Sequence, residues 1–259
     1  MEWRDEGVVL GVKKHGETSV IVELLTRGHG RHLGLVRGGR STRFQSLLQP
    51  GNSLLLEWRA RLDEHLGAYT VEPLTLRAGR LIGSALALHG LSYLGALVRL
   101  LPERDPHEAL HGALTVIADH LDAADIAPAL IARFEARILA ECGFGLDLDS
   151  CAASGVREDL IYVSPKSGRA VSATAGAPWR DKLLPLPAFL RGEEASPPAA
   201  AIADAFRMTG YFLERDLFGP RGLPMPDARR AFLAAAEASN PSPRFVGRRW
   251  PEGPDEGLG

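Results

Sequence analysis

The sequence predicts an α+β protein, in which a small antiparallel β-barrel over residues 1–80 precedes an α-helical domain. Three observations lead to this fold class. Residues 1–80 contain five short β-like runs that Gly- and Pro-containing turns separate. From about residue 81 the apolar residues recur with a helical period. The chain has 259 residues, 45% of them hydrophobic, which is enough to fill a sizeable core.

The five expected strands lie close together in the sequence, at residues 8–12, 19–26, 31–37, 54–59 and 68–76. The chain turns at Lys14-His15-Gly16-Glu17, at Arg27-Gly28-His29-Gly30 and at Pro50-Gly51. Five strands within 80 residues fit an oligonucleotide-binding barrel (OB-fold), and an SH3-like barrel would fit as well. The sequence leaves both barrels open.

Helices are expected at residues 81–94, 106–121, 128–139, 200–216 and 227–238. Pro106 and Pro128 stand where a first helical turn tolerates Pro, and Gly143 suits the end of the third helix. Residues 150–190 interrupt this pattern with short β-like pieces. We therefore predict a helical domain over 81–149 and 191–240, an insert over 150–190, and a flexible tail over 241–259 that is rich in Pro and Gly.

The formal net charge is only −2, but the charge is unevenly distributed. Residues 1–80 carry twelve Lys and Arg against nine Asp and Glu, so a site for a polyanion is expected in that part. No apolar run is long enough to span a membrane, and the charged N-terminus predicts no signal peptide. The two cysteines, Cys142 and Cys151, suit a reducing compartment, so we expect a cytoplasmic protein.

Residues 27–43 contain five arginines and no Asp or Glu. Arginine binds phosphate through its planar fork, and the glycines in this stretch allow a polyanion to approach the backbone. The stretch therefore predicts a contact with a phosphodiester backbone, although a solvated loop with scattered arginines remains an alternative. Three aromatic residues nearby could stack bases or belong to the core: Phe44, Trp58 and Tyr69.

A possible enzyme site is the segment His107-Glu108-Ala109-Leu110-His111, which matches the H-E-x-x-H motif of zinc hydrolases. Glu135 could supply a third ligand. Against this alternative, Pro106 places the motif in the first turn of a surface helix, where Glu108 already complements the helix dipole. No nucleophile elbow, phosphate loop or dinucleotide fingerprint is found in the sequence. We therefore predict no catalytic residues and no enzymatic activity.

Several short motifs run along the chain in a fixed order: Glu-Gly-Val-Val-Leu at 6–10, Gly-Glu-Thr-Ser at 16–19, Leu-Thr-Arg-Gly-His-Gly-Arg at 25–31, Val-Arg-Gly-Gly-Arg-Ser at 36–41, Leu-Gln-Pro-Gly at 48–51, Arg-Phe-Glu at 133–135 and Gly-Phe-Gly at 143–145. In these motifs the sequence resembles the RecO family of bacterial recombination mediators. The resemblance extends from the N-terminus to about Ala231.

This resemblance implies an N-terminal OB-fold domain, a helical domain and a small zinc-type insert. It implies a DNA-binding mediator of recombinational repair that acts in the cytoplasm at the nucleoid. Such a protein binds single- and double-stranded DNA, anneals complementary strands without ATP, and works with RecR. It also contacts the C-terminal tail of single-stranded DNA-binding protein and helps to load RecA. A generic OB-fold protein that binds RNA remains a rival interpretation.

Within this interpretation we predict that DNA phosphates contact four arginines, with two lysines as weaker candidates: Arg31, Arg37, Arg40, Arg43, Lys13 and Lys14. The partner tail is acidic and ends in an aromatic residue with a free carboxylate, so its receptor needs an apolar pocket beside an arginine. The candidates are Arg133, Phe134, Arg229 and Arg230. The alternative is that Phe134 belongs to the helical core and that these arginines are ordinary surface residues.

The segments Cys-Ala-Ala-Ser-Gly at 151–155 and Gly-Arg-Ala-Val-Ser at 168–172 resemble the zinc segment of the family. This chain departs from the four-cysteine pattern, because Ser154, Ser172 and Ala175 stand at the second, third and fourth cysteine positions. Only Cys151 remains, and one thiolate cannot hold a tetrahedral structural zinc ion. We therefore predict an insert without metal and a protein without cofactors.

Overall fold

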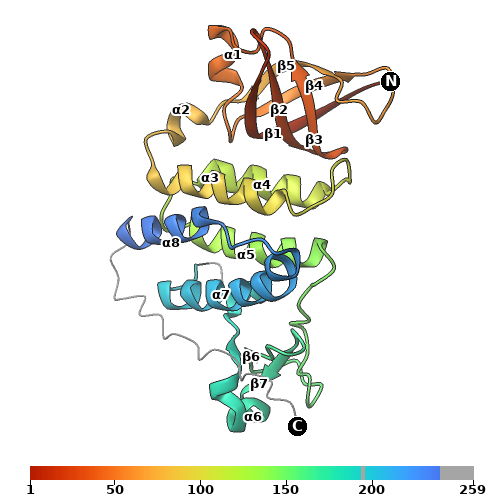
Figure 1. The fold of residues 1–259 in the computed structure, drawn as a ribbon. Coiled ribbons are helices and arrows are strands. Elements are labelled where there is room, and N and C mark those ends of the chain that lie inside the picture. The colour runs from red at the N-terminus through yellow and green to blue at the C-terminus, as the bar shows by residue number, and fades with distance from the viewer. Residues whose placement is uncertain (194–195, 240–259) are drawn as a thin grey trace.

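The computed structural model describes residues 1–193 and 196–239. Figure 1 shows a β-barrel at one end, successive layers of helices across the middle, and a small β-containing insert at the opposite end. The tail over residues 241–259, which the sequence predicts to be flexible, lies outside the described residues. No helix within the described ranges is long and apolar enough to cross a membrane.

The barrel consists of β1 (Glu2–His15), β2 (Ser19–Thr26), β3 (Gly30–Val36), β4 (Ser53–Arg59) and β5 (Ala68–Thr75). It closes in the order β1-β2-β3-β5-β4, and α1 (Thr42–Leu47) lies between β3 and β4 in the chain. β3 and β5 run parallel and pair through Leu35 and Ala68, whereas the other strand pairs are antiparallel. This topology is that of the OB-fold, which settles the choice between the two barrels.

β1 is much longer than the sequence pattern predicts. Its residues 2–8 pair with β4 and its residues 7–15 pair with β2, with a register irregularity between Val9 and Gly11. This one strand therefore closes the barrel. Apart from Trp3, residues 2–6 are all charged, so they lack the apolar alternation by which a strand is recognised in sequence.

The barrel core settles the role of two aromatic candidates. The side chains of Trp58 and Tyr69 are buried, and the Trp58 indole donates a hydrogen bond to the Leu66 carbonyl at 3.0 Å. His32 is also buried, with its Nδ1 atom 2.6 Å from the Tyr69 hydroxyl. Burial, helped by the positive charge of Arg104, lowers the pKa of His32 to about 4. These residues fill the barrel interior and cannot stack on bases.

The helical part comprises α2 (Ala78–Leu81), α3 (Ala85–Val98), α4 (Glu108–His120), α5 (Ala127–Glu141), α7 (Ala199–Phe212) and α8 (Asp227–Ser239). α7 continues into a π-helical turn, Leu213–Phe218, and then a 3₁₀ turn, Gly219–Arg221. The first expected helix is wrong at its start, because Ser84 accepts a hydrogen bond from the Ala87 amide and α3 begins there. The Pro at the start of α5 and the left-handed Gly143 at its end are confirmed.

The insert contains a three-stranded sheet in the order β7-β6-β8, with β6 at Leu160–Val163, β7 at Ala170–Ser172 and β8 at Leu184–Pro185. Short helical turns connect and follow these strands: α6 (Ala173–Gly176), η1 (Ala177–Lys182) and η2 (Ala188–Arg191). The buried residues of the insert belong to the same apolar core as those of α3, α5 and α7. The insert is therefore packed onto the helices by hydrophobic burial.

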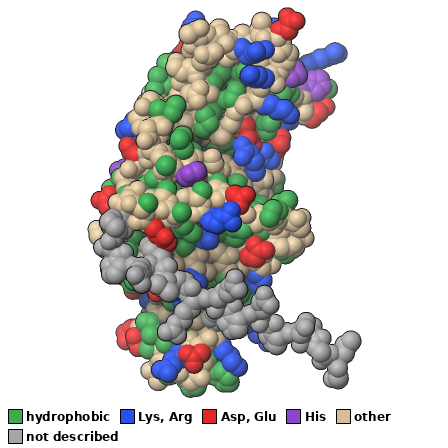
Figure 2. All heavy atoms as spheres, turned by 60° about the vertical axis from the view of Figure 1, so that its left-hand side comes forward, with side chains coloured by type: hydrophobic (Ala, Val, Ile, Leu, Met, Phe, Trp, Pro, Cys, Tyr) green, Lys and Arg blue, Asp and Glu red, His purple; other side chains and the backbone are tan. Residues whose placement is uncertain are grey.

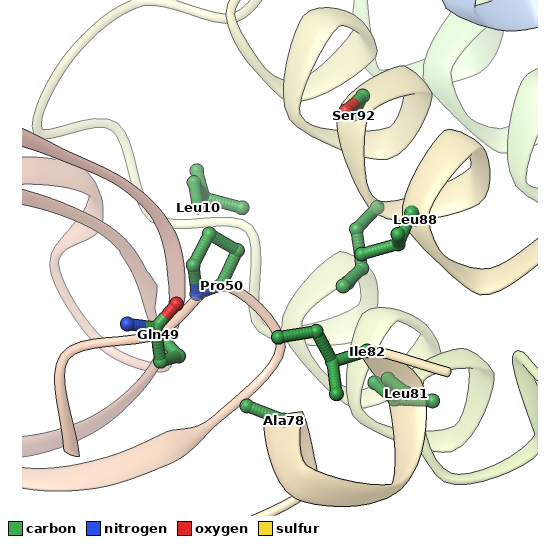
Figure 3. Close-up of a pocket in the computed structure, with 9 residues that line it drawn as sticks. Leu10, Gln49, Pro50, Ala78, Leu81, Ile82, Leu88 and Ser92 are labelled. Carbon is green, nitrogen blue, oxygen red and sulfur yellow. The ribbon is translucent and has the colours of Figure 1, made fainter. Parts of the chain in front are cut away.

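The barrel and the helices meet where β1 packs against α3 and α4, and where β2 packs against α4. Val8 and Leu25 of the barrel join the apolar core of the helices. Beside this contact lies a small apolar pocket of ≈ 240 Å³. Figure 3 shows Leu10 and Pro50 on the barrel side of this pocket and Ile82 and Leu88 on the helical side.

Candidate nucleic-acid interface

Five cations gather at the end of the barrel that points away from the helices. We call them the cationic rim: Lys13, Lys14, Arg37, Arg40 and Arg43. The lysines belong to the last residues of β1, Arg37 and Arg40 to the turn after β3, and Arg43 to α1. Figure 1 shows α1 at the top of the barrel, remote from the helical layers. All five side chains are exposed.

Backbone pairing brings these separate segments together. Lys14 is the cross-strand neighbour of Val20, and Val20 is the neighbour of Val36. The Arg40 amide then bonds the Thr18 carbonyl at 3.0 Å, and its guanidinium donates to the Glu17 carbonyl at 2.6 Å. The turn after β1 and the turn after β3 therefore form one continuous surface.

A hollow of ≈ 440 Å³ opens on this surface. Lys14 and Arg40 line it together with Phe44, and the Arg43 guanidinium lies 5.7 Å from the centre of the Phe44 ring. The hollow thus combines two cations with an aromatic face, the arrangement by which OB-fold proteins hold phosphates and stack a base. Of the three aromatic residues near the basic stretch, only Phe44 is placed for this role.

Few acidic groups oppose the rim. Residues 37–43 contain no Asp or Glu, and Glu17 is the only acid in residues 13–17. Within the described part of the chain, no carboxylate forms an ion pair with a rim cation. Figure 2 shows Lys and Arg side chains over the barrel, in the upper part of that face of the molecule. The rim can therefore attract a polyanion without first breaking an ion pair.

Arg31 does not belong to this surface, so its inclusion among the DNA contacts is corrected. It stands at the opposite end of β3, where its side chain is only 14% exposed. Its guanidinium lies 3.1 Å from Glu23 and 3.4 Å from Glu103, and Arg99 of the segment after α3 also bonds Glu23. Arg31 therefore helps to join the barrel to the helical part. His29, another residue of the basic stretch, stacks on Trp3 at that same end.

The zinc-hydrolase alternative is not supported by the geometry. His107 precedes α4, and its Nδ1 atom lies 3.0 Å from Glu141. Glu108 forms an ion pair with Arg27 of the barrel, whereas His111 is buried, which lowers its pKa. Among residues 1–193 and 196–239, no three His, Cys, Asp or Glu side chains are grouped so that they could hold a metal ion.

The four partner-tail candidates do not form one pocket, although Arg229 and Arg230 line the same hollow. Phe134 is buried in the helical core, and Arg229 forms an ion pair with the fully buried Glu135 at 2.8 Å. Arg133 packs its guanidinium 4.9 Å from the centre of the Phe189 ring. Phe134 is therefore corrected to a core residue.

Arg230 has a different environment from Arg229. Its side chain is 85% exposed and pairs with the equally exposed Asp227. It lines a hollow of ≈ 470 Å³ whose apolar walls include Met225 and Leu233. Of the four candidates, Arg230 alone combines an exposed cation with neighbouring apolar surface.

The insert does not fit a zinc ion. The four positions that hold cysteine in the family carry one thiol, two hydroxyls and a methyl group here, at Cys151, Ser154, Ser172 and Ala175. Cys151 is buried, and its sulfur accepts a hydrogen bond from the Ser172 amide at 3.3 Å. Ser172 in turn accepts a hydrogen bond from the Ala175 amide. Hydrogen bonds to sulfur and oxygen therefore occupy the two turns where a zinc ribbon would place its ligands.

An OB-fold barrel with a cationic rim, joined to a helical part, defines a class of proteins suited to contact with nucleic-acid backbones. Residues 1–77 match the family model described as Recombination protein O N terminal, and residues 84–223 match Recombination protein O C terminal. The chain belongs to the recombination protein O (RecO) family.

Its relatives include proteins named DNA repair protein RecO. That of Mesorhizobium japonicum is 61% identical over 236 residues, which cover 91% of this chain and 93% of the relative. That of a Chelativorans species is 60% identical over 242 residues, which cover 93% and 98%. That of Methylocella silvestris is 59% identical over 236 residues, which cover 90% and 95%. The chain thus aligns with DNA repair proteins over nearly their whole length.

Proposed function

We propose that this protein is a DNA-binding recombination mediator without catalytic activity, which acts at the nucleoid in the cytoplasm. It binds single- and double-stranded DNA through the cationic rim and anneals complementary strands. With RecR it helps to load RecA onto DNA that is covered by single-stranded DNA-binding protein. The observation that carries this proposal is the rim of exposed, unopposed cations beside the Phe44 hollow.

Charge neutralisation accounts for annealing without ATP. Two DNA strands repel one another through their phosphates, and a cationic surface that releases the condensed counterions lowers this repulsion. Phosphate contacts are independent of sequence, so the same surface serves any pair of complementary strands. The Phe44 ring adds a face on which an unpaired base can stack.

Replacing Arg37 and Arg40 by Ala should weaken binding of single-stranded DNA several-fold and flatten its salt dependence. Each lost phosphate contact lowers the slope of log K against log salt by about 0.7, so the double variant should lose about 1.4. Fluorescence anisotropy of a labelled oligonucleotide at several salt concentrations measures both quantities.

The matched control for this variant is Arg207→Ala combined with Arg230→Ala, which removes two positive charges outside the rim. Both arginines are paired with neighbouring Asp residues on the helices. The control should keep the wild-type slope. An identical slope in the rim variant would reject the rim as the DNA site, and preferential competition by RNA would favour the RNA-binding alternative.

We also propose that the tail of single-stranded DNA-binding protein contacts α8 through Arg230 and the hollow beside it. Arg230→Ala should weaken binding of an acidic peptide with a C-terminal Phe by about fivefold, because one exposed charge-assisted hydrogen bond is worth about 1 kcal/mol. Calorimetric titration measures the effect, and Arg207→Ala on α7 serves as the control. Equal binding of the peptide with an amidated C-terminus would argue against a carboxylate contact.

A further inference from the structure

The most exposed tryptophan of the described chain lies far from the barrel. Trp179 belongs to η1 in the insert, and 59% of the residue is accessible to solvent. Figure 1 shows the insert at the opposite end of the molecule from the barrel, with the helical layers between them. Tryptophan is the largest apolar side chain and is highly buried on average, so a ring left this open offers a large and accessible aromatic face.

The turn that carries Trp179 is anchored at both ends. Before it, Gly176 lies against the ring of Tyr162, where an added Cβ would come within 2.5 Å of a ring carbon. Pro178 is the second residue of the 3₁₀ turn and restricts its backbone. After it, Leu184 is buried in the strand β8. The indole therefore projects from a well-supported part of the insert.

Two cations lie next to Trp179 in the sequence, and one of them is placed over its ring. The Lys182 ammonium lies 5.7 Å from the centre of the Trp179 ring, which places it over an aromatic face. Arg180 is 73% exposed, and among the residues that the structure describes its only ion pair is with the neighbouring, almost fully exposed Asp181 at 3.8 Å. Residues 150–190 carry five Lys and Arg against three Asp and Glu, although residues 81–259 as a whole have an excess of acids.

We infer that Trp179, Arg180 and Lys182 form a second contact for single-stranded nucleic acid, with a base stacked on the indole and phosphates on the two cations. An aromatic face flanked by cations matches the repeated unit of a single strand, in which each base is followed by a phosphate. A lipid surface fits less well, because membrane binding of this kind relies on a long amphipathic helix and η1 has six residues.

This inference rests on the proposed DNA-binding function and extends it. The rim and the Trp179 surface lie at opposite ends of the molecule. Two strands, one bound at each site, would therefore stay apart until one of the sites releases its strand. A single protein could then bring two strands into the same complex. Two separate contacts also explain how a protein with net charge −2 could engage two polyanions, because each contact is locally positive.

The test measures capture of a second strand by the full-length protein. The protein is first bound to a thymidine oligonucleotide on beads, and a labelled, non-complementary oligonucleotide is then titrated in. Trp179→Ala should weaken capture of the second strand by about 5- to 150-fold, the range expected for one lost stacking contact of about 1–3 kcal/mol. Trp179→Phe, which keeps an aromatic face, should retain most of the capture, and thermal unfolding checks that both variants are folded.

The rim variant Arg37→Ala, Arg40→Ala separates the two hypotheses. If Trp179→Ala leaves second-strand capture unchanged while the rim variant weakens first-strand binding, the second contact is disproved and the DNA-binding function stands. If the wild-type protein binds neither strand, both are disproved. A blue shift of the tryptophan emission with anionic phospholipid vesicles that is lost in Trp179→Phe, without such a change on adding oligonucleotide, would overturn the inference in favour of a lipid contact.

Discussion

Glu135→Ala should lower the free energy of unfolding by about 3–5 kcal/mol, the cost of leaving one member of a buried ion pair without its partner. Glu135 is fully buried on α5 and accepts hydrogen bonds from three other helices. The donors are Arg229 of α8 at 2.8 and 3.2 Å, Tyr93 of α3 at 2.5 Å, and Thr209 of α7. One carboxylate therefore joins four helices.

The charges in this cluster depend on one another. Burial alone would lower the pKa of Arg229, but the Glu135 carboxylate more than offsets this effect and raises it. Burial and the same carboxylate raise the pKa of Tyr93, so its hydroxyl remains protonated and donates. Without Glu135, the guanidinium would keep its charge and would face only neutral acceptors, among them the Phe206 carbonyl at 2.6 Å.

Chemical denaturation followed by circular dichroism measures this effect. Arg230→Ala is the matched control. Arg230 follows Arg229, the partner of Glu135, in the sequence, but it forms an exposed ion pair with Asp227. The control should unfold like the wild type. A Glu135→Ala variant that is as stable as Arg230→Ala would show that the buried pair contributes no net stability.

Gly30→Ala is expected to destabilise the protein by about 1–3 kcal/mol more than Gly38→Ala, which is the cost of overpacking at a close contact. Both glycines have left-handed backbones, with φ of 64° and 66°, so both variants share the same conformational strain. They differ in their surroundings. A Cβ atom on Gly30 would overlap the backbone of Asp105, whereas nothing lies within 4 Å of a Cβ atom on Gly38.

The comparison tests how the barrel is attached to the helical part. Asp105 belongs to the segment before α4, which pairs with β3 through the bond from the Arg104 amide to the Arg31 carbonyl at 2.9 Å. A side chain at position 30 must push this segment away. Urea unfolding of the two variants gives the difference, and equal stabilities would mean that the segment moves aside at no cost.

The excess of positive charge identified residues 27–43 as a candidate site, but it could not distinguish the exposed arginines of this stretch from the paired ones. Arg31 is the second residue of β3 and Arg37 directly follows its last residue, yet one end of β3 faces the helices and the other faces solvent. Arg31 consequently forms ion pairs with Glu23 on the neighbouring strand and with Glu103, which is remote in sequence. A run of like charge is a local property, whereas its ion pairs depend on which distant segments the fold brings near.

The helical residues show the same limit. Helical periodicity predicted α5, but the motif at residues 133–135 places three side chains in different environments. Phe134 belongs to the core, Glu135 is the centre of a buried network, and Arg133 packs on Phe189.

Trp179 is exposed although its residue type favours burial. A tryptophan between Pro and Arg resembles any core aromatic in sequence, and only its position on an outer turn leaves it exposed.

By itself, the sequence determined the fold class, most strand and helix positions, the family and the local excess of positive charge near the N-terminus. These properties follow from the order and period of residues along the chain. The tertiary structure alone decided that Arg37 and Arg40 are exposed, that Arg31 and Glu135 hold elements together, and that Trp179 stands open at the far end. Exposure and pairing depend on contacts between residues far apart in sequence, which form only when the chain has folded.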